Sequence, residues 1–141
     1  MNRILPAVAL ISAYLAMSAT AFASANVSCA IDDANLDFEL EAIAGRSGPI
    51  NQVQVGSITL KAGTAKFVFD RSHIIRQWDY DGDMRLQIEV EDEPTKAHIN
   101  LYIFARLNRK TDKYSGRYVL KISKAGAEKE LKGRIKECEV G

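Results

Sequence analysis

The sequence lacks the residue patterns that mark most enzymes. It contains no glycine-rich phosphate loop, no nucleophile elbow and no cluster of cysteines and histidines at metal-ligand spacing. The two histidines, His73 and His98, lie far apart, and neither belongs to such a motif. These absences predict a non-enzymatic protein with no catalytic residues, no metal and no cofactor.

An excess of charge of one sign is also lacking. The chain has 19 basic and 18 acidic residues. Residues 1–23 contain Arg3 and no acidic residue, so the remainder carries 18 of each sign. Bulk charge therefore gives no reason to expect nucleic acid, an anionic membrane surface or a polyanionic substrate as partner.

Long apolar runs are missing outside the N-terminus. Arg3 precedes an apolar stretch over residues 4–16, and small residues follow at Ala21-Phe22-Ala23 and Ala23-Ser24-Ala25. This three-part pattern predicts a signal peptide over residues 1–23, with cleavage after Ala23 or Ala25. The run is too short and too weakly apolar for a transmembrane anchor. We therefore expect a periplasmic or secreted protein with no stable membrane anchor after cleavage.

Only two cysteines occur, Cys29 and Cys138, near opposite ends of the remaining chain. An even pair in an exported protein predicts a disulfide, because the compartment is oxidising. Two buried free thiols and a metal pair are the alternatives, and two cysteines without nearby histidines make a poor zinc site.

The dominant pattern is alternation of apolar and polar residues. Apolar residues recur at every second position over residues 36–40, 84–90, 99–107 and 114–122, and weaker strands are expected over 27–31, 53–60, 66–69, 74–80 and 130–138. We therefore predict one all-β domain over residues 24–141. It would be an antiparallel β-sandwich or flattened β-barrel of about eight strands.

Register follows from placing the apolar sets on one face. Residue pairs that sum to 189 place Leu86 opposite Ile103 and Val90 opposite Ile99. In the next hairpin, pairs that sum to 221 place Ile103 opposite Tyr118. A slip of one residue would turn a full apolar set toward water, so the pattern fixes the parity.

The same register predicts a cluster on the opposite face. Arg85 and Arg117 fall on either side of Phe104, and Tyr102 lies next to Phe104 on that face. Guanidinium groups stack on aromatic rings, and both residue types often anchor interfaces. These four residues are the candidate binding site. In the alternative interpretation, the two rings form ordinary cross-strand pairs or lie under a loop.

Asp79-Tyr80-Asp81-Gly82-Asp83 has two interpretations. Alternate carboxylates suit calcium, but the spacing is incomplete for an EF-hand, and Asp-Gly is a strong hairpin signal. We predict a turn. A two-residue loop would place Trp78 opposite Arg85, and a three-residue loop would place it opposite Leu86 in the core. The large apolar area of the indole favours the core position.

Ser115-Gly116-Arg117-Tyr118, with cysteines near both chain ends, resembles in outline the membrane-bound and periplasmic C-type lysozyme inhibitors. In that family a Ser-Gly motif that ends in Tyr enters the lysozyme cleft. The resemblance implies a small exported β-barrel that inhibits its target through the loop over residues 110–117. The motif here is one residue shorter and Tyr118 falls on the predicted core face, so no family site residue is transferred.

The leading hypothesis is a non-enzymatic exported binding or accessory protein. Its partner would be an unknown protein or glycan of the periplasm, held by Arg85, Tyr102, Phe104 and Arg117, and not a nucleic acid. The first alternative is an inhibitor of a hydrolase such as lysozyme. The second is a carrier of a small apolar ligand, which the dense predicted core disfavours.

Overall fold

The described part of the chain folds into a single antiparallel sheet of nine strands that is not closed. The computed structural model describes residues 24–45 and 49–141, so the predicted signal peptide lies outside the described residues. In chain order the elements are β1 Ala25–Asp32, β2 Leu36–Ala44, β3 Ile50–Leu60, β4 Lys66–Val68, the 3-10 turn η1 Arg71–His73, β5 Ile74–Tyr80, β6 Asp83–Asp92, β7 Ala97–Asn108, β8 Lys113–Lys124 and β9 Ala127–Val140. The predicted all-β fold is confirmed, and its strand number is nine.

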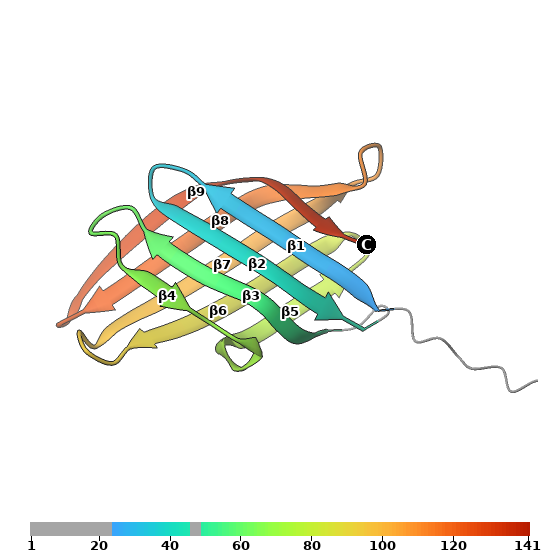
Figure 1. Cartoon of the computed structure of the whole chain (residues 1–141). Coiled ribbons are helices and arrows are strands. Elements are labelled where there is room, and N and C mark those ends of the chain that lie inside the picture. The colour runs from blue at the N-terminus through green and yellow to red at the C-terminus, as the bar shows by residue number, and fades with distance from the viewer. Residues whose placement is uncertain (1–23, 46–48) are drawn as a thin grey trace, which may run out of the picture.

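The sheet curls so that its two halves face each other. Its strand order is β4-β3-β2-β1-β9-β8-β7-β6-β5, and Figure 1 shows β1–β4 crossing in front of β6–β8. The apolar side chains of both halves form one buried cluster between them. Ile99, Leu101 and Ile103 of β7 are fully buried there, as the alternation predicted.

The predicted register is confirmed in both hairpins for which it was derived. Val90 pairs with Ile99 and Leu86 with Ile103 between β6 and β7, and Ile103 pairs with Tyr118 between β7 and β8. The outward-facing residues of these strands are therefore the ones that the sequence placed there.

The junction between the two halves is short. Strands β1 and β9 pair through only four residue pairs, from Val27 with Val140 to Ala30 with Glu137, whereas β7 and β8 pair through eleven. The predicted disulfide between Cys29 and Cys138 joins directly opposed residues within this junction, with Cα atoms 4.2 Å apart. It therefore holds the first four strands to the last five.

The edges of the sheet are linked by side chains. Strands β4 and β5 end the strand order, and the turn η1 lies between them in the chain. The Arg71 guanidinium donates one hydrogen bond to the Ile50 carbonyl at 2.6 Å and another to the Ile74 carbonyl at 2.9 Å. The Ile50 N–H donates to Gln77 Oε1 at 2.8 Å. These bonds hold β3 against β5 without a backbone ladder between them.

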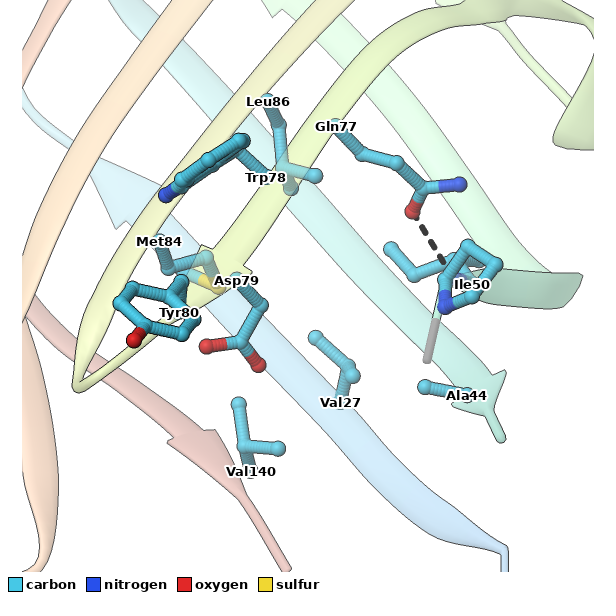
Figure 2. A pocket seen from close by; sticks show the side chains of 11 residues that line it. Val27, Ala44, Ile50, Gln77, Trp78, Asp79, Tyr80, Met84, Leu86 and Val140 are labelled. Atoms are coloured by element: carbon cyan, nitrogen blue, oxygen red, sulfur yellow. Dashed lines mark hydrogen bonds between the residues drawn. The ribbon is translucent and has the colours of Figure 1, made fainter. Parts of the chain in front are cut away.

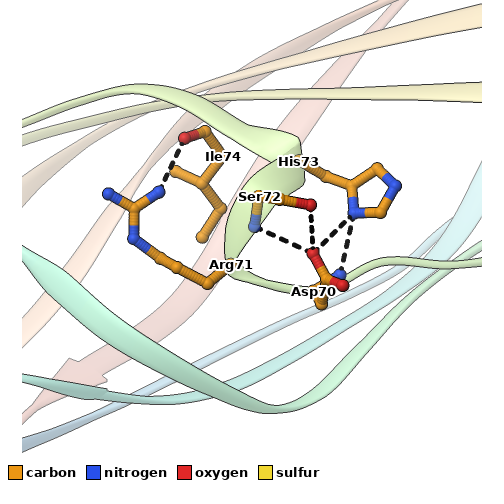
Figure 3. Close-up of polar contacts among 5 residues, drawn as sticks. All are labelled: Asp70, Arg71, Ser72, His73 and Ile74. Carbon is orange, nitrogen blue, oxygen red and sulfur yellow. Dashed lines mark hydrogen bonds and ion pairs between the residues drawn. The ribbon is translucent and has the colours of Figure 1, made fainter.

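The η1 turn is fixed by its own cap (Figure 3). The Asp70 carboxylate accepts hydrogen bonds from the Ser72 N–H and hydroxyl, and the Asp70 N–H donates to His73 Nδ1 at 3.1 Å. This reciprocal arrangement is a capping box. The hydrogen bonds from the Ser72 hydroxyl and N–H hold the pKa of Asp70 below its usual value. The cap thus orients Arg71 toward the edges that it bridges.

Candidate functional site

The four predicted site residues lie together on the outer face of β6, β7 and β8. Arg85 pairs with Phe104, and Phe104 pairs with Arg117. The Arg117 guanidinium carbon lies 4.6 Å from the centre of the Phe104 ring, in stacking geometry. Tyr102 and Phe104 are half-buried, and both arginines are exposed. The structure thus brings the predicted cluster together on a surface that solvent reaches.

Trp78 belongs to this outer face, so the predicted core position of Trp78 is wrong. Tyr80 pairs with Asp83, which leaves Asp81 and Gly82 as a two-residue loop and places Trp78 opposite Arg85. Asp81 and Gly82 have φ angles of 50° and 76°, as the type I′ hairpin turn requires. The Trp78 residue is 57% exposed. The predicted turn is confirmed.

One row of residues crosses the face from β5 to β9. Trp78, Arg85, Phe104, Arg117 and Arg134 occupy paired positions on five successive strands. We call this set the arginine–aromatic row. Sequence reasoning missed both ends of the row, because the loop length before β6 was misjudged and no register was derived for β9. The Asp-Gly pair with a two-residue loop was the signal that would have placed Trp78.

Shallow depressions flank the centre of the row. One lies on the β5 side and is lined by residues that include Ile75, Trp78, Tyr102 and Phe104. The other lies on the β8 side, around Phe104, Gly116, Arg117 and Arg134. A side chain at Gly116 would collide with the β7 backbone at Phe104 and Ala105, so glycine keeps these strands in close contact. Phe104 thus borders both hollows.

A polar ladder lies beside the row on the same face. The Gln87 amide donates to Asn100 Oδ1 at 3.1 Å and to the Tyr102 hydroxyl at 3.3 Å. Asn100 in turn donates to Glu89 Oε1 at 2.8 Å. These bonds fix the orientation of the Tyr102 ring. Its hydroxyl is already engaged with Gln87, so the ring face is the part of Tyr102 best placed for contact.

A cavity of about 300 Å³, which Trp78 and Tyr80 also line, opens at one end of the curled sheet (Figure 2). Its lining is mostly apolar and includes Val27, Ile50, Met84 and Val140. The Asp79 carboxyl lies among these side chains, and burial raises its pKa. The volume is at the lower end of the range for ligand pockets, so only a small ligand would fit.

The four residues that resemble the lysozyme-inhibitor motif do not share one environment in the structure. Ser115, Gly116 and Arg117 are exposed in β8, whereas Tyr118 is fully buried. The Tyr118 hydroxyl donates to Asp33 Oδ2 at 2.5 Å and accepts from the Asn35 amide at 3.0 Å. The tyrosine that ends the motif is thus part of the internal structure here.

Metal-ligand clusters and membrane-spanning helices are both missing from the described residues. No group of three or more His, Cys, Asp or Glu side chains in residues 24–45 and 49–141 is arranged to hold a metal ion. Over the same residues, no helix is long and apolar enough to cross a bilayer.

The chain matches no protein-family model, no curated protein and no solved structure. The geometry of the arginine–aromatic row is therefore the basis for the function proposed below.

Proposed function

We propose that this chain is a non-enzymatic exported binding protein that contacts its partner through the arginine–aromatic row and Tyr102. The observation that carries the proposal is the register of the row, which places aromatic rings and guanidinium groups side by side on an accessible face. Exposed aromatics and arginines supply large contact area and directional hydrogen bonds, so they dominate many interfaces. The disulfide is compatible with an oxidising compartment.

The row is not required to hold the fold together. The buried cluster lies on the other side of the sheet, and none of the row residues belongs to it. Large aromatic residues exposed without a packing role are unusual on a small protein, and a contiguous set of them marks an interaction site. Trp78 and Tyr80 are both more than half exposed, and their rings are in edge-to-face contact at 6.1 Å. Tyr80 therefore extends the apolar surface beyond the row.

The proposal is tested with the double variant Tyr102→Ser/Phe104→Ser and the control Val68→Ser. Val68 is an exposed apolar residue on β4, outside this face. Each protein is immobilised and exposed to an envelope extract of the organism that encodes it. We expect the wild type and the control to retain the same component, and the double variant to lose it.

Thermal and urea unfolding of the same three proteins separates contact from packing. The double variant should lose only about 1–2 kcal/mol, since each half-buried cross-strand pair contributes less than about 1 kcal/mol. A loss of several kcal/mol per residue would show that the rings are core residues. Equal capture by the double variant and the wild type would refute the proposed contact surface.

The apolar cavity favours a second candidate, a carrier of a small ligand, because its lining is apolar apart from a few polar groups such as Asp79 and Gln77. Mass spectrometry of material extracted from the natively purified protein tests it. A stoichiometric small molecule supports the carrier function, and its absence from several preparations discards it. In the described residues no observation favours hydrolase inhibition.

A further inference from the structure

Arginines and acidic residues are unevenly distributed over the outer face of β5–β9. Five exposed arginines gather around the row, namely Arg76, Arg85, Arg106, Arg117 and Arg134. Most acidic residues of the same face lie toward the opposite strand ends, at Glu89, Glu91, Glu128 and Glu130, where Lys121 also lies. Asp83 lies among the arginines. The balanced total charge of the sequence conceals this local basic surface.

Most of these arginines have no carboxylate partner. Arg85 pairs with Asp83 at 2.9 Å. Among the described residues, Arg76, Arg106, Arg117 and Arg134 form no ion pair. Unpaired like charges on adjacent strands repel one another, so they destabilise the free protein slightly. An anionic ligand would relieve this repulsion and gain charge-assisted hydrogen bonds.

Aromatic rings and guanidinium groups alternate along the row from β5 to β8 at a regular spacing. Trp78 and Phe104 are two strands apart, and Arg85 and Arg117 are offset from them by one strand. Neighbouring strands are separated by about 4.8 Å, so each element of the pattern repeats at roughly 9.6 Å. A linear ligand lying across the strands would meet a stacking surface and a guanidinium in turn.

We infer that the ligand is an acidic polysaccharide in which charged and uncharged sugars alternate; this inference rests on the proposed binding function. One strand spacing is close to the length of one pyranose unit in an extended chain. Uncharged rings would stack on Trp78 and on the side of Phe104 that borders the hollow toward β5, because Arg117 covers the other side. Carboxylates would accept hydrogen bonds from Arg85 and Arg117. An extended acidic peptide fits less well, because its side chains recur on one side at about 6.6–6.8 Å.

The test uses the protein that is purified after expression of its full coding sequence. Trp78 is the only tryptophan of the chain, so its fluorescence reports on the row directly. The probe is a hyaluronan oligosaccharide, which alternates a uronic acid with an uncharged amino sugar. Dextran, poly-glutamate and oligo-thymidylate serve as uncharged sugar, acidic peptide and single-stranded nucleic acid.

We expect hyaluronan to change the Trp78 fluorescence saturably, with an affinity that falls as salt is added. Arg117→Gln should weaken binding about tenfold or more, since it removes a charge-assisted pair. Lys66→Gln makes the same change of charge on β4, outside the row, and should bind as the wild type does.

Tighter binding of poly-glutamate or oligo-thymidylate than of hyaluronan would overturn the polysaccharide inference and leave the proposed contact surface standing. Dextran binding as tight as hyaluronan binding would overturn the role of charge. The absence of any response to hyaluronan would also overturn the inference. The capture experiment with Tyr102→Ser/Phe104→Ser decides the proposed function independently of these outcomes.

Discussion

Removal of one hydroxyl group should weaken the attachment between the two halves of the sheet. Tyr118 of β8 is fully buried and crosses β9 at Gly133 to reach the turn between β1 and β2. There it donates to Asp33 Oδ2 at 2.5 Å. The Asp33 carboxylate also accepts from the backbone N–H groups of Asn35 and Leu36, at 2.8 and 3.1 Å. Tyr118→Phe keeps the ring and removes the hydroxyl, and with it the bond to Asp33 and the bond from the Asn35 amide.

The expected loss is about 1.5–3 kcal/mol, the usual contribution of a hydrogen bond to a charged group. Urea unfolding at pH 7 measures it. Tyr80→Phe is the matched control, because that residue is 71% exposed and its replacement should change stability by less than about 0.5 kcal/mol.

The pH dependence of this stability loss shows whether the hydrogen bond from Tyr118 to Asp33 causes it. Burial and the hydrogen bond to Asp33 raise the pKa of Tyr118 to about 12, from an ordinary value of 10.0. A raised pKa means that the folded state favours the neutral phenol. The stabilisation is therefore complete below pH 10 and is lost as pH rises toward 12. The difference in unfolding free energy between wild type and Tyr118→Phe should shrink over this interval. A difference below about 0.5 kcal/mol at pH 7, or one that stays constant up to pH 12, would refute the reasoning.

Two further variants test the same junction. Cys29→Ala/Cys138→Ala removes a link between residues 109 apart in sequence, and the chain-entropy relation gives a loss of unfolding free energy of about 4.8 kcal/mol as an upper value. Urea unfolding against the oxidised wild type measures this loss. An unchanged unfolding midpoint would contradict the role of the disulfide in holding β1 to β9. Gly133→Ala would place a Cβ against the Tyr118 ring and Asp33 Oδ2, so it should cost about 1–3 kcal/mol by overpacking, whereas Gly141→Ala would place its Cβ against no neighbour. Equal losses in the two glycine variants would contradict this packing.

The strands of the C-terminal half were predictable because their alternation is long and uninterrupted. In β6 to β8 every second residue is apolar, and a shift by one position would expose the whole set, so parity and register followed from the sequence. The predicted cluster around Phe104 followed from that register. Strands β2 and β3 offered no such guide, because their pairing shifts twice, between Glu41 and Ala42 and between Ile43 and Ala44.

The two main failures have different physical causes. Trp78 was predicted in the core because of its hydrophobicity. The length of the loop at Asp81–Gly82 decides which face it occupies, and the two-residue loop places it on the outer face. The bond from Tyr118 to Asp33 joins residues 85 apart in sequence, and it depends on the missing side chain of Gly133. Local patterning contains no signal for such a contact, because the crossing exists only once β1, β8 and β9 are assembled.

The central claim is that the rings of the arginine–aromatic row are exposed to solvent in a positive local field. Collisional quenching tests it most directly in the variant Trp78→Phe/Phe104→Trp, whose only indole lies between Arg85 and Arg117. Relative to a free indole, we expect iodide to quench this fluorophore more effectively than caesium does. Adding Arg85→Gln and Arg117→Gln should reduce the preference. Protection from both quenchers, or a preference for caesium, would contradict the claim.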